Sequence, residues 1–382
     1  MHIAFLTPEY PHERIGSSGG LGTSIKNLAL ELVRSNVTVS IIVYGKTKTA
    51  EFNDAGIQFY ILKQKKYRIG GFYLYRMRIN RFLNYLIKDK GIDLLEAPDW
   101  TGITAFMKFK IPVVIRLHGS DTYFCHIEKR PQKWKNRFLE KCAVNTAAAF
   151  IAPTAFACEL SAKLFKIKAS RIEVIRHGIQ INKFKNERPE DYLSYSILNI
   201  GTLIRKKGMF QLIQIFNKIV DDFPDATLTL VGGDAPDVAT GNNSTWEMMR
   251  KQMSPAAVKN VAYKSVLPYE NVLAEIKNAH VCVFPSLAET LGMVTIESMA
   301  LQKAVVNTNI GWAQDIITNG EDGCMHHPDD ITSYVKSITS IFNNKNLSLE
   351  LGHKARMKVE DRFDIRKIVD DNIKFYLKVL AS

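Results

Sequence analysis

Residues 280–297 read HVCVFPSLAETLGMVTIE, and their character changes twice within this short stretch. The first part, 280–284, is an apolar run rich in β-branched residues, which is typical of a strand buried on both faces of a sheet. A polar loop starts at Pro285, and a helical pattern begins at about Leu291 to Gly292. Strand, loop and helix in this order form the repeating unit of a parallel α/β sheet.

The same alternation of short apolar runs and helical patterns extends through the rest of the chain. The predicted strands are 2–6, 37–44, 57–62, 92–96, 113–117, 150–152, 172–175, 196–200, 227–231, 281–284 and 304–307. The predicted helices are 23–34, 132–148, 154–165, 209–222, 269–278, 293–301, 331–342 and 365–380. A polar segment, 181–194, separates two series of strands, so we expect two Rossmann-like α/β domains. A chain of 382 residues with 46% apolar content is long enough to bury two cores.

The loop that precedes the helix at 293 is a candidate anion site. Backbone amides and the positive end of the helix dipole point toward the carboxyl end of the strand, and Gly292 leaves room for a phosphate. Glu289 in the loop and Glu297 in the helix can each reach hydroxyl groups beside that anion. A diphosphate flanked by two polyols is a nucleotide sugar. The alternative is an ordinary helix start with a solvated Glu297.

A second candidate loop, 201–208, reads GTLIRKKG and also joins a predicted strand to a predicted helix. Its three consecutive cations, Arg205, Lys206 and Lys207, suit a diphosphate because they can neutralise the charge on a leaving phosphate. A solvated basic helix start is the alternative. Cations at a helix N-terminus oppose the dipole unless an anion is bound, and this favours the anion site.

Two weaker candidate sites lie in the first half. Residues 17–22 read SSGGLG, and the glycines would let backbone amides face a ligand. The spacing does not match the dinucleotide fingerprint. His118 follows the predicted strand 113–117, although a lone histidine is usually structural.

Together these segments resemble retaining glycosyltransferases of family 4, which have the GT-B fold of two Rossmann-like domains with parallel sheets facing across a cleft. Glu289 and Glu297 are separated by seven residues, as in the Glu-x7-Glu signature of that family. In the family the first Glu meets the donor sugar and the second meets the ribose hydroxyls. Thr290 and Leu291 stand where Gly or Ser and Phe are common.

The resemblance implies roles for further residues. In the family an Arg after the first Gly of the basic loop and a Lys before the last Gly hold the phosphates. Lys207 matches that Lys, whereas Thr202 stands in place of the Arg, so Arg205 or Lys206 would substitute. The segments 96–100 and 176–179 also resemble family segments. The implied catalytic residues are Lys207, Arg205, Glu289 and His118, and the implied donor-binding residues are Gly19, Gly20, Gly201, Lys206, Thr290, Leu291, Gly292, Met293, Val294 and Glu297.

The implied activity is transfer of a sugar, with retention, from a nucleotide-sugar donor linked to UDP, GDP or ADP to a glycan or lipid-linked acceptor, in bacterial surface polysaccharide biosynthesis. Residues 1–185 would form the acceptor-side domain, with 365–382 packing back on it, and 186–364 would bind the donor. We expect no cofactor and no metal, because no Asp-x-Asp site and no zinc-ligand spacing occur. An epimerase or a phosphorylase can share this fold.

The charge and the N-terminus suggest a location and a further partner. The net charge is +13, and residues 63–90 hold nine basic residues, one acidic residue and several aromatic ones. This stretch would contact an anionic membrane surface, or it is a solvated surface or a pyrophosphate-acceptor groove. Nucleic-acid binding would also explain the charge, but the basic residues form no recognisable reading motif. Five widely spaced cysteines, no signal-like start and no apolar run of about 20 residues favour a cytoplasmic protein.

Overall fold

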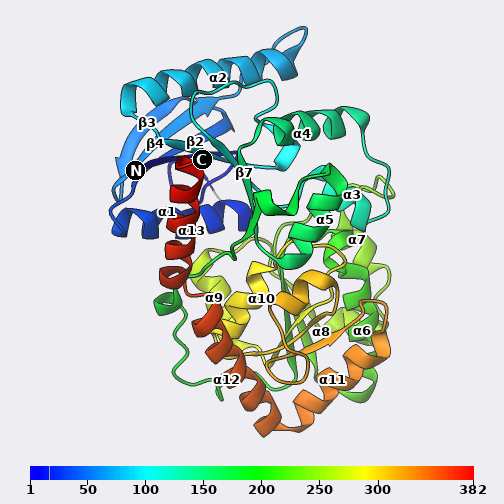
Figure 1. Ribbon diagram of the computed structural model, residues 1–382. Coiled ribbons are helices and arrows are strands. Elements are labelled where there is room, and N and C mark those ends of the chain that lie inside the picture. Colours follow the sequence, from blue (N-terminus) through cyan, green and yellow to red (C-terminus); the bar gives the residue numbers. More distant parts are fainter. Residues whose placement is uncertain (17) are drawn as a thin grey trace. The chain divides into compact units, whose positions relative to one another are not determined.

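The computed structural model describes residues 1–16 and 18–382, so Ser17 of the glycine-rich loop lies outside the described residues. The chain divides into two compact units (Figure 1). Unit 1 comprises Met1–Gln180 and Asp364–Ser382, and unit 2 comprises Ile181–Phe363.

The first boundary between the units follows Gln180, whereas the polar segment led us to place it after residue 185. The difference arises because Phe184 is buried rather than part of an open linker. Its backbone carbonyl accepts a hydrogen bond from Arg356, which also belongs to unit 2. The start of the polar segment is therefore part of the second unit.

Unit 1 is built on one sheet of eight strands with helices packed against it (Figure 1). Its elements are β1 (His2–Thr7), α1 (Gly20–Arg34), β2 (Thr38–Lys46), β3 (Ala50–Asp54), β4 (Ile57–Lys63), α2 (Gly71–Lys90), β5 (Leu94–Pro98), β6 (Val113–Arg116), α3 (Asp121–Ile127), α4 (Trp134–Thr146), β7 (Ala149–Ala152), α5 (Ala155–Phe165), β8 (Ile172–Val174) and α13 (Ile365–Leu380). The strand order is β3-β4-β2-β1-β5-β6-β7-β8. The pairs from β4 to β8 are parallel, as predicted, and β3 adds an antiparallel edge through a tight turn at Ala55 and Gly56.

The helix α2 was not predicted, because the basic residues of 63–90 obscured its apolar face. Tyr75, Ile79, Leu83 and Leu86 recur at helical spacing and are buried in a cluster with residues of the sheet. The charged side chains of α2 are exposed apart from Arg76, which is buried and donates hydrogen bonds to backbone carbonyl groups. The basic stretch is thus one face of an amphipathic helix plus the loop before it.

The last helix, α13, belongs to unit 1 although it follows unit 2 in the sequence. It packs beside α1, and Ile368, Val369, Phe375 and Tyr376 join the same buried cluster as Leu28 of α1. The chain therefore begins and ends in the same unit (Figure 1).

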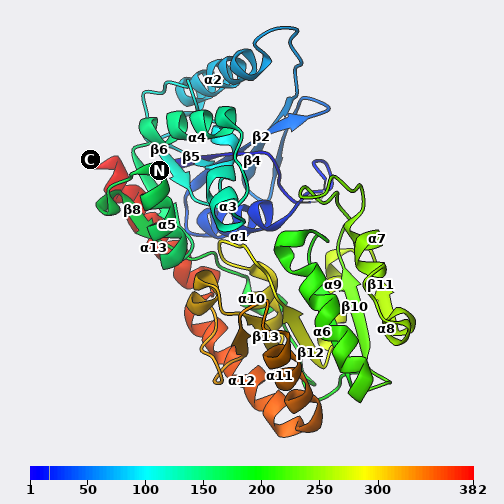
Figure 2. The same ribbon diagram turned by 90° about the vertical axis from the view of Figure 1, so that its right-hand side faces the viewer.

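Unit 2 holds a parallel sheet of six strands in the order β11-β10-β9-β12-β13-β14 (Figure 2). Its elements are β9 (Ser196–Ile200), α6 (Met209–Asp222), β10 (Thr227–Val231), α7 (Thr245–Arg250), α8 (Pro255–Asn260), β11 (Val261–Tyr263), α9 (Tyr269–Asn278), β12 (Val281–Phe284), α10 (Met293–Ala300), β13 (Ala304–Thr308), β14 (Cys324–His326), α11 (Ile331–Asn343) and α12 (Lys345–Arg362). The strand order reverses between β9 and β12, and in open α/β sheets ligands bind at such a switch point.

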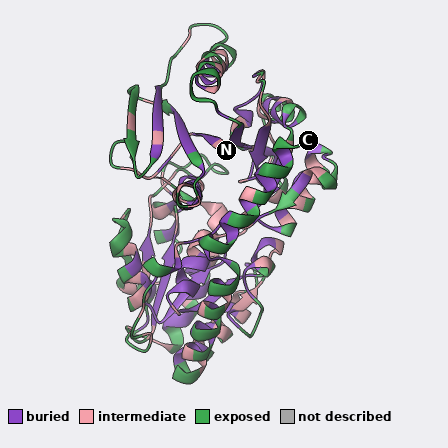
Figure 3. Cartoon of the chain, turned by 60° about the vertical axis from the view of Figure 1, so that its left-hand side comes forward, coloured by how far each residue is buried: buried purple, intermediate pink, exposed green. Residues whose placement is uncertain are grey.

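Burial follows the layers of both units. The strands are mostly buried, whereas the outward faces of the helices are exposed (Figure 3). This is the pattern expected for sheets covered by amphipathic helices. Over residues 1–16 and 18–382, the structure contains no helix that is both long and apolar enough to span a bilayer.

Candidate functional site

The loops that follow β9 and β12 are joined to each other at the switch point of unit 2. The backbone amide of Leu287 donates to the carbonyl of Lys206 at 2.7 Å. Gly208 has a positive φ of 70°, and a Cβ atom added there would lie 1.8 Å from the carbonyl oxygen of Pro285. Only glycine permits this approach. The contact fixes the neighbouring Lys207 at the carboxyl ends of the two central strands.

Lys207 and Glu289 form an ion pair across these two loops. Both side chains are partly buried, with exposed fractions of 22% and 16%. They line a pocket of unit 2 whose other lining residues are Asn199, Ile200, Phe284, Ser286, Gly292, Val294, Thr295 and Trp312. A partly buried ion pair that lines a pocket can exchange one partner for a charged ligand.

The polar lining of this pocket was only partly predictable from the sequence. Asn199 and Ser286 could have been found, because they lie at or just after the ends of the two predicted strands. Trp312 could not, because it lies in a short 3₁₀ helix, Gly311–Asp315, far along the chain. Gly201 adjoins the pocket, where a Cβ atom would lie 3.9 Å from Cε of Lys207.

The helix α10 begins at Met293, directly after Gly292, whose φ is 95°. The predicted strand, loop and helix are thus observed. Of the residues predicted here to bind a donor, Gly292 and Val294 line the pocket. Leu291 is buried, and Thr290 and Met293 are half-buried outside the pocket lining.

Glu297 lies in the second turn of α10 and is only 5% exposed. Burial raises the pKa of its carboxyl group to about 7. The hydroxyl of Tyr269, the first residue of α9, donates a hydrogen bond to Oε1 at 2.9 Å. Tyr269 was not predicted, because no local pattern links it to a residue 28 positions away. The pair of Tyr269 and Glu297 thus contains a carboxyl group whose pKa is close to neutral pH.

Arg205, for which the resemblance implies a catalytic role, is paired with an aspartate of the same unit. Its guanidinium donates to both oxygens of Asp237, at 2.9 and 2.8 Å, and stacks on the ring of Phe210 at 4.5 Å. The hydrogen bonds from Arg205 hold the pKa of Asp237 down at about 2. Arg205 is not among the residues that line the pocket. Of the three cations in the loop, Lys207 is the one at the pocket.

In unit 1, the glycine-rich loop is held by a carboxylate. The backbone amides of Gly19 and Gly22 donate to Oε1 of Glu9 at 3.0 and 2.9 Å. Gly19 is the N-cap of α1, and Gly20 is its first residue. Two amides of this loop therefore already bind an acidic group, which the sequence reasoning did not anticipate.

His118 is positioned by its backbone and by a second histidine. Its amide and that of Gly119 donate to the carboxylate of Asp99 at 3.0 and 3.2 Å. The rings of His118 and His177 stack, with centroids 5.0 Å apart. Burial lowers the pKa of His118 well below its usual value and that of His177 to about 3, so both rings are neutral at physiological pH.

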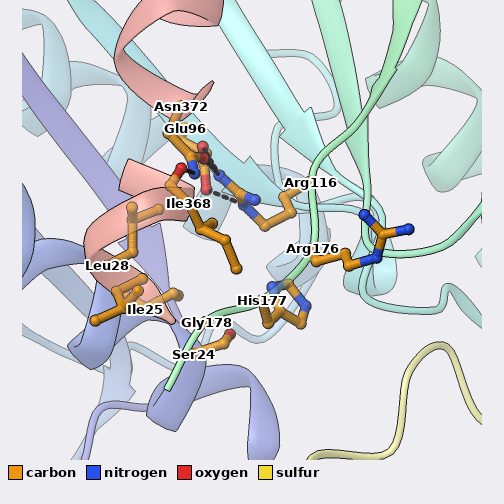
Figure 4. Close-up of a pocket in the computed structure, with 11 residues that line it drawn as sticks. Ser24, Ile25, Leu28, Glu96, Arg116, Arg176, His177, Gly178, Ile368 and Asn372 are labelled. Carbon is orange, nitrogen blue, oxygen red and sulfur yellow. Dashed lines mark hydrogen bonds and ion pairs between the residues drawn. The ribbon is translucent and has the colours of Figure 1, made fainter. Parts of the chain in front are cut away.

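The segments 96–100 and 176–179, singled out in the sequence, meet Arg116 of β6 around a hollow in unit 1. Arg116 donates to both carboxylate oxygens of Glu96, at 2.7 and 3.0 Å, and to Asn372 of α13 at 2.7 Å. His177 lies next to this pair, while the side chain of Arg176 points away from it (Figure 4). The buried ion pair ties the last helix to the sheet of unit 1.

Solved structures of similar architecture define the class of the fold. A sucrose-phosphate synthase from Thermosynechococcus elongatus matches with a TM-score of 0.82 and 17% identity, over 100% of this chain and 99% of that one. Anabaena Alr3699/HepE in complex with UDP-glucose matches with a TM-score of 0.77 and 17% identity, over 99% and 100% of the two chains. At such identities the likeness concerns the fold alone. It is the GT-B fold of glycosyltransferases.

Family models match the two halves of the chain in turn. The model for Glycosyltransferase Family 4 matches residues 18–183, and the model for Glycosyl transferases group 1 matches residues 179–358. The chain belongs to glycosyltransferase family 4. Its predicted membership and its predicted fold are thereby confirmed.

Two bacterial relatives cover different shares of the chain. The capsular polysaccharide biosynthesis glycosyltransferase CapM of Staphylococcus aureus is 28% identical over 208 residues, which is 51% of each chain. The chain thus matches about half the length of CapM. The alpha-maltose-1-phosphate synthase of Mycolicibacterium smegmatis is 22% identical over an alignment of 413 positions, which covers both chains fully.

Proposed function

We propose that this glycosyltransferase moves a sugar, with retention of anomeric configuration, from a nucleotide-sugar donor to a hydroxyl of a glycan or lipid-linked acceptor. The Lys207–Glu289 ion pair in the unit 2 pocket carries the proposal. It places a cation beside the N-terminus of α10, where an anionic group is favoured. Solved relatives are described as complexes with UDP and with UDP-glucose, which makes uridine donors the first to test.

The donor diphosphate would bind between Lys207 and the first amides of α10. The diphosphate would replace Glu289 as the partner of the Lys207 ammonium. The Glu289 carboxylate would then be able to accept hydrogen bonds from hydroxyl groups of the donor sugar. Glu297, which is hydrogen-bonded to Tyr269, would accept hydrogen bonds from the ribose hydroxyls. Gly201 and Lys206, with Thr290, Leu291, Met293 and Val294, would shape the loops around the diphosphate, and Gly19, Gly20 and His118 keep the donor-contacting roles that the family implies.

In the proposed reaction, the acceptor oxygen attacks the anomeric carbon on the face from which the diphosphate departs. The bond from that carbon to the phosphate oxygen breaks as the bond to the acceptor oxygen forms, and the acceptor proton passes to the leaving phosphate. Lys207 stabilises the charge that develops on the diphosphate. Arg205 keeps the catalytic role that the family implies, and its ion pair with Asp237 would hold the loop in place.

We further propose that the transfer needs no metal and takes place in the cytoplasm, in polysaccharide assembly. The Lys207 ammonium would supply the positive charge that a divalent ion supplies elsewhere. Full activity in the presence of a chelator is the expected result. Activity that is lost with the chelator and restored by one divalent ion would contradict metal independence.

The test of the donor begins with thermal unfolding in the presence of UDP-, GDP- and ADP-sugars. A ligand that binds only the folded state raises the melting temperature, and one nucleotide class should do so. Proton NMR of the product made from that donor then gives the anomeric configuration. An inverted product would remove the retaining mechanism, and an epimerised donor or phosphate-dependent cleavage would assign the protein to another activity of the same fold.

A further inference from the structure

Two stretches of unit 1 carry almost the whole net charge of the protein. Residues 63–90 hold nine basic residues and one acidic residue, and residues 128–141 hold six basic and two acidic ones. Together they account for +12 of the net charge of +13. The rest of the chain is nearly neutral, so the excess charge is concentrated rather than spread over the surface.

The tertiary structure brings these two stretches together at the start of α2 and the start of α4 (Figures 1 and 2). Nζ of Lys135 lies 4.2 Å from the ring centre of Phe72. The ring of Phe106 bridges the two helices, with its centroid 5.5 Å from that of Tyr73 and 6.1 Å from that of Phe138. We call this region of α2, α4 and the loop before α2 the α2–α4 surface.

The α2–α4 surface exposes large apolar side chains among its cations. The exposed fractions are 83% for Ile69, 43% for Phe72, 44% for Tyr73, 41% for Leu74, 79% for Trp134 and 50% for Phe138. Six large exposed apolar side chains gathered in one place mark an interaction surface more often than a solvated one.

The acidic residues of the two stretches do not offset the positive charge of this surface. Glu140 is buried and accepts hydrogen bonds from the amides of α3. Glu128 is paired with Arg130 at 2.7 Å, and Asp89 lies at the far end of α2, paired with Lys90. A partner for this surface must therefore be anionic and must also accept apolar side chains.

We propose that the α2–α4 surface binds the headgroup region of an anionic lipid bilayer. Lysine and arginine side chains attract the anionic headgroups, while tryptophan and other aromatic rings enter the interface below them. A nucleic acid would use the cations and the rings, but it offers no environment for Ile69 and Leu74, which cannot stack on bases. The biological reason for such binding rests on the proposed function, since a lipid-linked acceptor lies at a bilayer. Binding to the bilayer itself can be measured without donor or acceptor.

Vesicle flotation of the full chain tests the proposal. We expect the protein to float with vesicles that contain phosphatidylglycerol and to stay behind with vesicles of phosphatidylcholine alone. Each basic residue near an anionic surface strengthens binding about fivefold. Replacing three of the exposed cations of α4 and its approach should thus weaken binding at least about tenfold. The variant carries Lys133→Gln, Lys135→Gln and Arg137→Gln, and its charge-matched control carries Lys218→Gln, Lys251→Gln and Lys259→Gln on exposed positions of unit 2.

The apolar component is tested with Trp134. Its fluorescence should shift to the blue on binding to phosphatidylglycerol vesicles, because the ring leaves water. Trp134→Phe should keep the binding and lose that shift. Trp134→Ala should weaken binding, whereas Leu377→Ala, a 53% exposed apolar position on α13, should not.

Several results would overturn the proposal. These are no flotation with anionic vesicles, equal flotation with neutral ones, an equal loss in the unit 2 control, or displacement of the protein from vesicles by a nucleic acid at equal charge. The two proposals fail separately. If nucleotide sugars stabilise the protein and it does not float, only the bilayer inference falls, and if it floats without donor stabilisation, only the donor-binding proposal falls.

Discussion

Replacing Glu297 by glutamine should change how the stability of the protein depends on pH. The Glu297 carboxyl is 5% exposed, and its pKa is raised from 4.5 to about 7 by burial. In the unfolded chain this group loses its proton near pH 4.5, but in the folded protein it keeps it until about pH 7. The folded state therefore binds more protons between these values, and its stability falls as the pH rises through 7.

The magnitude follows from the two pKa values. One pKa unit corresponds to about 1.4 kcal/mol, so the full effect is about 3 kcal/mol, of which about 2.5 kcal/mol lies between pH 5 and pH 8. Glutamine has the same shape, does not titrate in this range, and can still accept the hydrogen bond from Tyr269. Relative to wild type, Glu297→Gln should gain about 2.5 kcal/mol in unfolding free energy on going from pH 5 to pH 8.

Urea unfolding of both proteins at the two pH values measures this difference. Comparing the change between the two pH values cancels any constant effect of the amide. Glu270→Gln, at an exposed position of the same region, is the control and should show no such change. An equal stability difference at pH 5 and pH 8 would refute the reasoning, because Glu297 would then not titrate as a buried carboxyl group.

Three further substitutions test the site and the packing that supports it. Lys207→Ala should lower turnover by about 10² to 10³, which is the usual cost of losing one electrostatic donor, while the fold is kept. Single-turnover kinetics at saturating donor measure this loss, and near wild-type turnover would remove Lys207 from the site. Gly208→Ala should unfold at clearly lower temperature than Gly320→Ala, since both have positive φ but only the first meets a backbone oxygen at 1.8 Å; equal melting temperatures would contradict the close approach. Glu96→Ala leaves Arg116 buried without its carboxylate and should cost about 3 to 5 kcal/mol in urea unfolding; a loss below about 1 kcal/mol would mean that the pair is solvated.

The fold was predictable where local periodicity decides it. Buried strands of parallel sheets are short apolar runs, and the helices that cover them are amphipathic. The pattern of apolar residues within each short segment therefore predicts the order of these elements. The segment 280–297 is the clearest case, since its strand, loop and helix were all predicted within a residue or two. The helix α2 was not predicted, because basic residues lie between the apolar residues of its buried face.

The partners of the charged side chains were decided by the tertiary structure alone. Lys207 meets Glu289 across 82 positions, whereas Arg205, two residues earlier, meets Asp237. The amides of the glycine-rich loop meet Glu9.

Such pairings depend on how loops from separate strands pack at one edge of a sheet, and no local pattern encodes that. The sequence by itself therefore determined the layers of this protein and the family motif with its spacing. The tertiary structure decided which cation lies at the pocket, which carboxylate titrates near neutrality and which two distant stretches form one basic, apolar surface.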